Sequence, residues 1–238
     1  MEDLDVMRHS AAHVMAAAVC KLYPNVKLDI GPSTDDGFYY DFDLEHRLSP
    51  EDFPAIEAEM ERLIKAALPF ERREVTRAEA AELMAGQPYK LDRLSDIPED
   101  ETVSLYTCGD FTDLCRGPHV ATTADIGAVK LTSVAGSYYH GDENNPMLQR
   151  LYVMADVSQE ALDAVLARIE EAKRRDHRKL GKELELFSIS DDVGPGLAHW
   201  HPKGARIRVA IEDFWRREHL RAGYEMVFTP HVGRARLW

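Results

Sequence analysis

Apolar residues recur at helical spacing through the first part of the chain. Between residues 3 and 22 they form a broad stripe that ends at Tyr23-Pro24, where a helix stops readily. Two strand-like runs follow, residues 26–30 and 37–43, and the loop between them is rich in turn-forming residues. The pattern therefore predicts a long helix followed by a β-hairpin.

A second helix is expected from Ser49 to about Ala67. Ser49 suits the N-cap, Pro50 suits the first helical position, and acidic residues fill the first turn. The apolar residues at helical spacing, which predict its buried face, are Phe53, Ile56, Met60 and Ile64.

Strand-like segments dominate the next hundred residues. Residues 69–75 suit a strand, and Thr76-Arg77-Ala78-Glu79 has the form of a capping box that opens a short helix. Short β-branched and aromatic runs occupy residues 102–139, and residues 147–155 suit another strand. We therefore predict that residues 1–157 form one α+β domain with an antiparallel sheet and helices on one side.

Two long amphipathic helices are expected in the rest of the chain. Ser158 caps the first, which is expected to run to about Leu180. The second spans residues 203–221 and leads into a strand-like run at residues 224–229. We assign residues 158–182 to a linker helix and residues 183–238 to a separate helix–strand segment.

Composition restricts the classes of protein and partner. The formal charge is −13 over 238 residues, which argues against bulk affinity for nucleic acid. No run approaches the roughly 20 apolar residues that a membrane helix needs, so no membrane partner is expected. Three cysteines are too few for a disulfide framework, and the acidic start differs from a secretory signal. We therefore expect a cytoplasmic protein.

One basic stretch departs from this acidic balance. Its six cations fall within ten positions and are Lys173, Arg174, Arg175, Arg178, Lys179 and Lys182. They suit a solvated helix face balanced by Glu170, Glu171 and Asp176 through i,i+4 pairing. They also suit a surface that lies along nucleic-acid phosphates. The sequence leaves both alternatives open.

Two short motifs carry the candidate chemistry. His9 and His13 are four positions apart in the predicted first helix, so they share one helix face, and only small residues separate them. Cys115 and His119 flank a turn at Gly117-Pro118, which can bring the thiol to the imidazole. Three imidazoles and one thiol suit a tetrahedral zinc ion or a metal-free hydrolytic pocket.

Each motif alone has an ordinary structural explanation. A histidine on an apolar face is usually a core residue, and a buried cysteine is commonly inert. Lys90 and Asp113 would count as a surface ammonium and a surface carboxylate. Asp113 nevertheless shares one face of an extended strand with Cys115, two residues later. The two motifs together in one domain favour a functional site.

Longer motifs surround these residues, and further motifs occur along the rest of the chain. They are HSAAH at 9–13, GP at 31–32, GFYYDF at 37–42, DLCRGPH at 113–119, AGSYY at 135–139, MLQR at 147–150 and RRDHRKLG at 174–181. In this order they closely resemble bacterial threonyl-tRNA synthetases. The resemblance implies an editing domain at 1–157, of a type shared in outline with alanyl-tRNA synthetase, and a linker helix at 158–182. It also implies that residues 183–238 begin a class II catalytic domain with its first helix and strand, motif 1.

The resemblance further implies what a chain truncated here lacks. The sequence ends at Trp238, before motifs 2 and 3, the catalytic zinc ligands and the anticodon-binding domain of the family. ATP and that zinc ion belong to the missing part. We therefore expect that this chain alone does not join threonine to tRNA(Thr).

For the editing domain, the resemblance implies roles residue by residue. His9 positions the terminal ribose or the attacking water, Lys90 contacts the substrate and stabilises charge, and Asp113 orients the water. The residues that complete the pocket are His13, Tyr40, Cys115 and His119. The set His9, His13, Cys115 and His119 resembles a zinc site of the alanyl relatives, whereas the bacterial threonyl branch is expected to edit without bound metal. Both alternatives stay open.

Such a domain would hydrolyse mischarged Ser-tRNA(Thr). Threonine exceeds serine by one methyl group, which is worth only about 1–3 kcal/mol in a binding pocket, so a second, hydrolytic site is needed. The partner would be tRNA(Thr), bound through its 3′ end and acceptor stem. The aromatic residues available to stack on the terminal adenine are Phe38, Tyr39, Tyr40 and Tyr139, although alternation along a strand places half of them in the core.

A binding fragment without catalysis is the alternative class of function. In that case the motif 1 helix docks on a second copy as a homodimer, or on a partner that carries the rest of the catalytic domain. Phe214, Trp215 and Leu220 would supply an apolar patch for such a contact.

Overall fold

The computed structural model describes residues 2–99, 101–194, 196–230 and 234–235. Two compact units divide the chain, Met1–Arg168 and Ile169–Trp238. The first unit contains both motifs singled out in the sequence. Among the described residues of either unit, no helix combines the length and the apolar character needed to cross a membrane.

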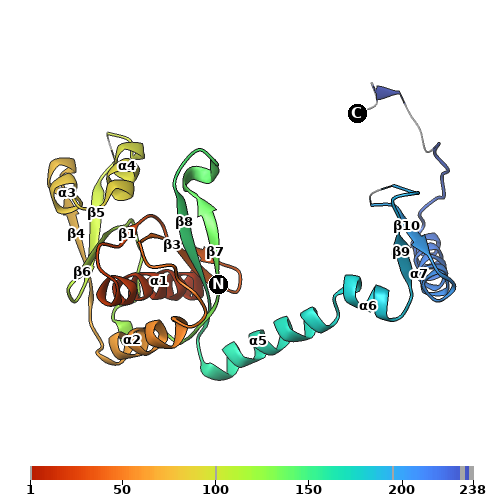
Figure 1. Ribbon diagram of the computed structural model, residues 1–238, viewed down its shortest axis with the longest axis horizontal. Helices are drawn as coiled ribbons and strands as arrows, with labels where there is room; N and C mark the ends of the chain where they lie inside the picture. The colour runs from red at the N-terminus through yellow and green to blue at the C-terminus, as the bar shows by residue number, and fades with distance from the viewer. Residues whose placement is uncertain (1, 100, 195, 231–233, 236–238) are drawn as a thin grey trace. The chain divides into compact units, whose positions relative to one another are not determined.

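An antiparallel sheet forms one part of the first unit (Figure 1). Its strand order is β1-β3-β8-β7, with β2 beside β3. The strands are β1 (Lys27–Leu28), β2 (Ser33–Thr34), β3 (Gly37–Asp43), β7 (Ala128–Tyr138) and β8 (Met147–Asp156). The predicted hairpin is present in a different form. Its first strand is only two residues long, and the expected loop contains β2, because Ser33 and Thr34 pair with Phe38 and Gly37.

Two helices cover one face of this sheet, α1 (Glu2–Leu22) and α2 (Phe53–Lys65) (Figure 1). The predicted long first helix is therefore confirmed. Alternation along β3 turns Phe38, Tyr40 and Phe42 into the core that α1 covers. Strand β8 adds Leu151, Val153 and Ala155 to the same core. Burying each large side chain contributes about 1.5–3 kcal/mol, so this layer fixes α1 on the sheet.

Helix α2 begins later than predicted. Its N-cap is Asp52, not Ser49, and the proline of its first turn is Pro54, not Pro50. The Asp52 carboxylate accepts a hydrogen bond from the Ser49 N–H at 2.8 Å, so a separate turn precedes the helix. The expected inner face is confirmed at Phe53, Ile56 and Met60, and Ile64 is half-buried.

A second antiparallel sheet departs from the single predicted sheet. Its strands pair in the order β4-β5-β6 and are β4 (Phe70–Val75), β5 (Val103–Cys108) and β6 (Phe111–Leu114). The α+β class and the antiparallel pairing are confirmed, but the single sheet is wrong. Periodicity reveals strands without revealing their partners, because long-range packing decides which strands pair.

Two short helices accompany the second sheet, α3 (Arg77–Leu83) and α4 (Pro88–Asp96). The capping box at the start of α3 is confirmed, since Thr76 and Glu79 bond reciprocally. Arg77 of α3 donates to the Leu94 carbonyl at 2.7 Å and so holds the end of α4. Helix α4 carries Lys90. Two 3-10 turns, η1 (Thr123–Asp125) and η2 (Tyr139–Gly141), complete this unit.

The expected linker helix is broken into two. Helix α5 (Gln159–Arg174) ends before Asp176, which leaves helical geometry and caps α6 (His177–Glu183) by accepting a bond from the Arg178 N–H at 2.8 Å. Aspartate competes for backbone N–H groups in this way, which favours a new helix start over continuation. The rest of the second unit is β9 (Phe187–Ile189), β10 (Ala198–Trp200) and α7 (Pro202–Arg221).

The strand expected at residues 224–229 is not formed. No described residue pairs with this segment, and the side chains of Tyr224, Val227 and Phe228 are exposed. A strand requires a hydrogen-bonded neighbour. The expected helix–strand unit is therefore present only as its helix, α7, on which Phe214, Trp215 and Leu220 are also exposed.

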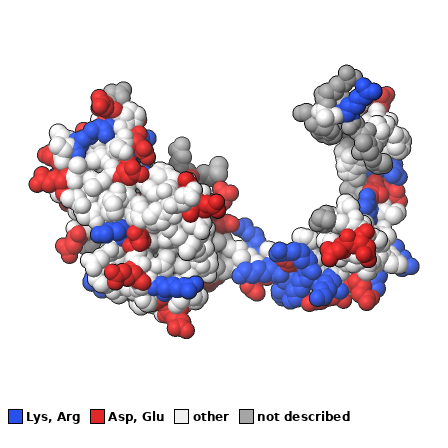
Figure 2. Space-filling model, turned by 45° about the horizontal axis from the view of Figure 1, so that its top comes forward, with Lys and Arg blue, Asp and Glu red and all other residues white. Residues whose placement is uncertain are grey.

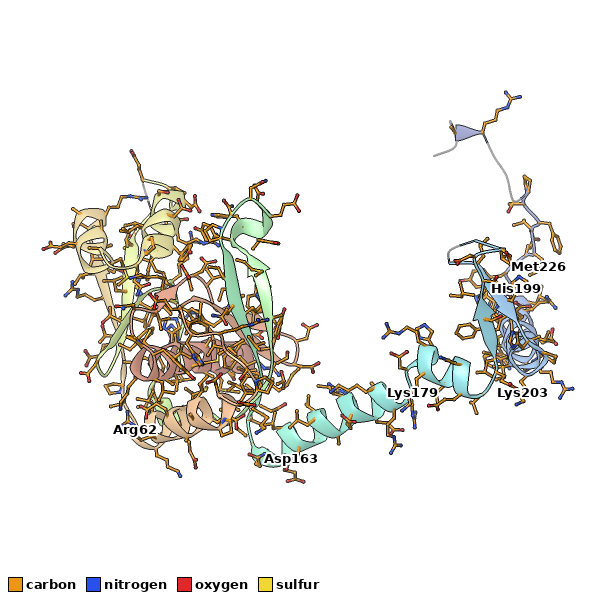
Figure 3. The ribbon with its side chains drawn as sticks, in the orientation of Figure 1. Arg62, Asp163, Lys179, His199, Lys203 and Met226 are labelled. Atoms are coloured by element: carbon orange, nitrogen blue, oxygen red, sulfur yellow. The ribbon has the colours of Figure 1, made fainter. Side chains whose placement is uncertain are left out.

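Basic side chains gather over the end of α5 and over α6 (Figure 2). Arg175 pairs with Glu171 at 2.6 Å and Arg178 pairs with Asp176 at 2.6 Å, as expected for a solvated helix face. Lys179 projects from α6 (Figure 3) and forms no ion pair with any described residue. Acidic neighbours therefore pair with Arg175 and Arg178, whereas Lys179 has no acidic partner among the described residues.

Candidate functional site

The two sequence motifs meet where α1 passes the loop after β6. The Cys115 sulfur lies 3.3 Å from His9 Nε2 and 3.3 Å from His119 Nε2. His13 completes the group, with its ring centre 5.3 Å from that of His9 and 4.4 Å from that of His119. We call these four residues the His–Cys cluster. The turn and the helix spacing thus bring together every member of the expected set.

Ser10 joins the two motifs. Its hydroxyl lies 3.0 Å from His119 Nδ1 and accepts a bond from the Val120 N–H at 3.0 Å. The Phe70 ring stacks on the His119 ring with centres 4.9 Å apart and planes 5° apart. Neither Ser10 nor Phe70 was identified from the sequence. The helix spacing that aligns His9 with His13 does not reveal which neighbour reaches His119.

Gly117 shapes the turn of the second motif. Its φ is +72°, and a Cβ atom there would lie 2.2 Å from the Tyr106 hydroxyl oxygen. Its N–H donates to the Cys115 sulfur at 3.2 Å. Glycine is therefore required both for the backbone conformation and for the space that Tyr106 fills.

A second polar group faces the His–Cys cluster. The Lys90 ammonium lies 2.7 Å from Asp113 Oδ1 and donates to the Tyr40 hydroxyl at 3.1 Å. The Tyr40 hydroxyl in turn donates to Asp113 Oδ2 at 2.7 Å. His13 Nε2 lies 4.0 Å from the same carboxylate and connects the two groups. We call Lys90, Asp113 and Tyr40 the Lys–Asp–Tyr group.

The Lys–Asp–Tyr group is deeply buried. The exposed fractions are 4% for Lys90, 2% for Asp113 and 1% for Tyr40. Burial strengthens electrostatic interactions but makes any unpaired charge costly, so these groups must stay paired. Lys90 and Asp113 are thus not the surface residues that their chemistry alone suggests.

A cavity of about 430 Å³ joins the two groups. We call it the candidate pocket. The predicted site residues in its wall are His9, His13, Tyr40, Lys90, Asp113 and Cys115. His119 is not part of this wall, but its Nε2 lies 3.3 Å from the Cys115 sulfur. Residues 30–33, which run from the connection after β1 into β2, form another part of the wall, and a Cβ atom on Gly31 would lie 2.1 Å from the Tyr40 ring.

Of the four aromatic residues considered for stacking, only Tyr40 lines the candidate pocket. Phe38 is buried in the core under α1. The Tyr39 ring lies under the Arg150 guanidinium, whose carbon is 3.9 Å from the ring centre. Tyr139 donates to Asp92 at 2.6 Å on the side of α4. Strand alternation separates these side chains as expected.

Known proteins are similar to this chain in sequence. Residues 103–152 match a family model described as the second additional domain of threonyl and alanyl tRNA synthetases. Over its whole length the chain is 55% identical to threonine–tRNA ligases of Dehalococcoides mccartyi and Nitratidesulfovibrio vulgaris, and 53% identical to that of Citrifermentans bemidjiense. The resemblance to threonyl-tRNA synthetases is confirmed. The chain spans 41% of the length of the first relative and 37% of the other two.

Burial favours the uncharged forms of the His–Cys cluster. It lowers the pKa of His13 well below its ordinary value, and with the neighbouring imidazoles it lowers the pKa of His119 to about 2. Burial also raises the pKa of the Cys115 thiol to about 11. A reactive cysteine needs a thiolate stabilised by a cation. Cys115 therefore does not have the character of an activated nucleophile.

The donor set of the His–Cys cluster fits a zinc ion. One donor atom from each residue can be chosen so that all four lie within 4.8 Å of one another, and imidazole and thiol are preferred zinc ligands. The Ser10 hydroxyl on His119 Nδ1 resembles the outer hydrogen bond that commonly orients a ligating histidine. A zinc ion held by His9, His13, Cys115 and His119 would have a complete tetrahedral shell, and it would supply a positive centre beside the candidate pocket.

Proposed function

We propose that the candidate pocket hydrolyses the ester between serine and the 3′ end of tRNA(Thr). One observation carries the proposal: the Lys–Asp–Tyr group and members of the neutral His–Cys cluster line the same cavity. An ester hydrolase needs a group that orients water and a cation near the developing oxyanion. The similarity to threonine–tRNA ligases supplies the substrate class.

Each catalytic residue has a proposed task in this reaction. Asp113 orients the attacking water through its carboxylate, while Lys90 stabilises negative charge on the carbonyl oxygen. His9, whose pKa is lowered mainly by burial, acts as a neutral imidazole that positions the water or the ribose hydroxyls. The water oxygen bonds to the carbonyl carbon, and the bond to the ribose oxygen breaks. Serine and a free tRNA 3′ end are the products.

The remaining site residues shape the pocket for serine. Tyr40 holds Lys90 and Asp113 in place through its hydroxyl. His13 and Cys115 line the side on which the small amino-acid side chain is proposed to sit, and His119 contacts Cys115 from outside the cavity wall. An editing site of this kind hydrolyses the product that is small enough to enter it, which favours serine over threonine. The chain's own residues thus account for the reaction, with or without a metal ion in the His–Cys cluster.

The partner in this proposal is tRNA(Thr), which presents its 3′ end to the pocket in the cytoplasm. Lys179, exposed on α6, is available for contact with tRNA phosphates. Such contacts make binding weaken as salt rises.

Hydrolysis assays test the proposal directly. The purified chain is incubated with Ser-tRNA(Thr) and, separately, with Thr-tRNA(Thr). We expect loss of serine at least about ten times faster than loss of threonine. His9→Ala and Lys90→Ala should abolish the difference. Lys130→Ala, which breaks only an exposed pair with Glu57, is the matched control. Equal rates for the two esters, or full activity of the Lys90 variant, would contradict the proposal.

A further inference from the structure

Helix α4 must be held in place from outside because it is short. It has nine residues, and its N-cap residue Gln87 makes no side-chain cap. Isolated helices of this length are unstable in water, so tertiary contacts decide where the helix sits. The position of Lys90, in its first turn, therefore depends on groups elsewhere on α4.

Arg93 makes such a contact one turn after Lys90. Its guanidinium donates to both carboxylate oxygens of Asp29, at 2.9 and 3.1 Å. Asp29 is only 2% exposed, and Arg93 also lies over the Tyr139 ring at 5.3 Å. A two-pronged arginine–carboxylate bond fixes orientation as well as distance. Arg93 therefore contributes to the position and the rotation of α4, together with the bonds of Gln87 to Val26 and Leu28 and of Tyr89 to Asp43.

Asp29 adjoins one wall of the candidate pocket without lining it. It directly precedes residues 30–33, which line that wall. Its N–H donates to the Asp41 carbonyl at 3.1 Å, and the Asp41 N–H donates to the Ile30 carbonyl at 3.0 Å. The wall is thus attached to β3. Through Asp29, Arg93 connects α4 to this fixed wall.

The Arg93–Asp29 pair lies beside the candidate pocket and not in it. A smaller cavity of about 170 Å³ has Asp29, Arg93, Lys90 and Cys115 in its wall, whereas the candidate pocket is lined by Lys90 and Cys115 without the pair. In the smaller cavity Arg93 donates two of its N–H groups to Asp29, so the guanidinium is engaged with a carboxylate of the chain itself. We therefore assign the Arg93–Asp29 pair a role in holding α4 in place and not a role in binding a ligand.

We propose that Arg93 and Asp29 are positioning residues that set the separation of Lys90 from the wall at residues 30–33. The inference rests on the proposed hydrolysis, for which that separation defines the space for the ester. Displacing a catalytic group by about 1 Å can reduce a rate about 100-fold. Loss of the pair should therefore slow the reaction at the pocket although neither residue touches the reacting atoms.

Kinetics of four variants test the proposal. Arg93→Gln should reduce kcat for Ser-tRNA(Thr) hydrolysis by about 10- to 100-fold with KM changed less than about threefold. Arg93→Lys keeps the charge but not the paired bonds, so we expect only partial recovery. The double variant Asp29→Asn, Arg93→Gln leaves no unpaired buried charge, so it should fold. Its kcat for Ser-tRNA(Thr) hydrolysis should remain as low as that of Arg93→Gln. Arg168→Gln, which breaks an exposed pair with Asp36, should behave as wild type.

A second measurement does not depend on activity. Acetylation of individual lysines, followed by mass spectrometry, reports how far Lys90 is shielded. We expect Lys90 to react at least about five times faster in Arg93→Gln, because misplacing α4 opens it to solvent. Lys130 should react at an unchanged rate. Wild-type kcat together with unchanged Lys90 labelling would overturn the positioning proposal. A wild-type chain that hydrolyses neither ester would instead refute the proposed function, and the labelling would still decide the role of Arg93.

Discussion

The ammonium of Lys90 lies 2.7 Å from a carboxylate oxygen of Asp113, and the two residues are 4% and 2% exposed. Lys90 comes from α4 and Asp113 from β6, while Tyr40, which bonds to both, comes from β3 of the other sheet. The Lys90–Asp113 pair therefore belongs to the candidate site and also to the contact between the two sheets.

Removing one member of this pair should destabilise the protein strongly. Lys90→Met leaves a buried carboxylate without its cation, and we expect the free energy of unfolding to fall by about 3–5 kcal/mol. Lys90→Met combined with Asp113→Leu should recover much of that loss, because both charges are gone. Neither variant should hydrolyse Ser-tRNA(Thr). Urea denaturation measures the stabilities. A double variant less stable than Lys90→Met would contradict this account.

Gly31 should be essential for the placement of Tyr40. In Gly31→Ala the new methyl carbon would lie 2.1 Å from the Tyr40 ring, so the ring must move away from Asp113 and Lys90. We expect hydrolysis to fall about 100-fold and the free energy of unfolding to fall by about 1–3 kcal/mol. Gly86→Ala is the matched control, since nothing lies within 4 Å of its added carbon. Equal hydrolysis rates for Gly31→Ala and Gly86→Ala would show that the position of Tyr40 does not depend on the absence of a side chain at Gly31.

The local parts of the site are predictable from the sequence, and the long-range parts are not. Helical spacing places His9 beside His13, and the turn at Gly117-Pro118 brings Cys115 to His119, as the motifs indicate. Tyr40 and Asp113, however, are 73 residues apart, and no periodicity links them. Lys90 and Asp113 enter the predicted site only through the family resemblance.

The fold shows the same division. The apolar stripe of α1 and the capping box at Thr76 follow from nearest neighbours along the chain. The second sheet does not, because strand pairing is decided by packing between distant segments. Asp176 breaks the linker helix because its side chain offers a better start for α6, an alternative that apolar spacing alone does not reveal.

Acid should weaken the contact between α1 and α2. Glu59 of α2 bonds to Arg62 and to Lys21 of α1, and these contacts lower its pKa to about 2 from the usual 4.5. The native state thus holds fewer protons than the unfolded state between these values. The contribution is complete above pH 4.5 and is lost as the pH falls toward 2.

Glu59→Gln should therefore lower stability at pH 7 by about 1 kcal/mol, because both cations are largely exposed, and should flatten the decline below pH 4.5. Urea titrations at several pH values measure both effects. Glu61→Gln, which breaks the exposed pair with Lys65, should change stability by less than about 0.5 kcal/mol. The same acid profile for wild type and Glu59→Gln would rule out this role for Glu59.

Zinc should bind the His–Cys cluster without being needed for hydrolysis. The donor set fits the ion, and zinc at about 100 times its Kd should stabilise the fold by about 2.7 kcal/mol. His13→Ala should lose most of this effect. Because Lys90, Asp113 and Tyr40 form the other side of the pocket, we expect chelator-treated protein to retain Ser-tRNA(Thr) hydrolysis. Thermal unfolding and the hydrolysis assay, each with and without chelator, decide both points.

Salt should distinguish the two interpretations of the basic stretch. If Lys179 contacts a tRNA phosphate, Lys179→Gln should weaken tRNA binding and reduce the slope of log K against log salt by about one. Arg175→Gln should have a smaller effect, since Glu171 already pairs with that arginine. Filter binding at several salt concentrations provides the slopes. Identical slopes for wild type and Lys179→Gln would leave the solvated helix face as the explanation.

The packing of α1 against β8, a strand far later in the sequence, has a consequence during protein synthesis. Helix α1 is translated well before β8, but the core that covers it includes Leu151, Val153 and Ala155 of β8, and Arg8 donates to the Ala155 carbonyl at 3.0 Å. On the ribosome the helix therefore emerges with its apolar stripe uncovered and waits for most of the first unit to follow. His9 and His13 meet their partners only near the end of that interval. A nascent chain consequently completes its pocket late, after a period in which the apolar stripe of α1 is uncovered.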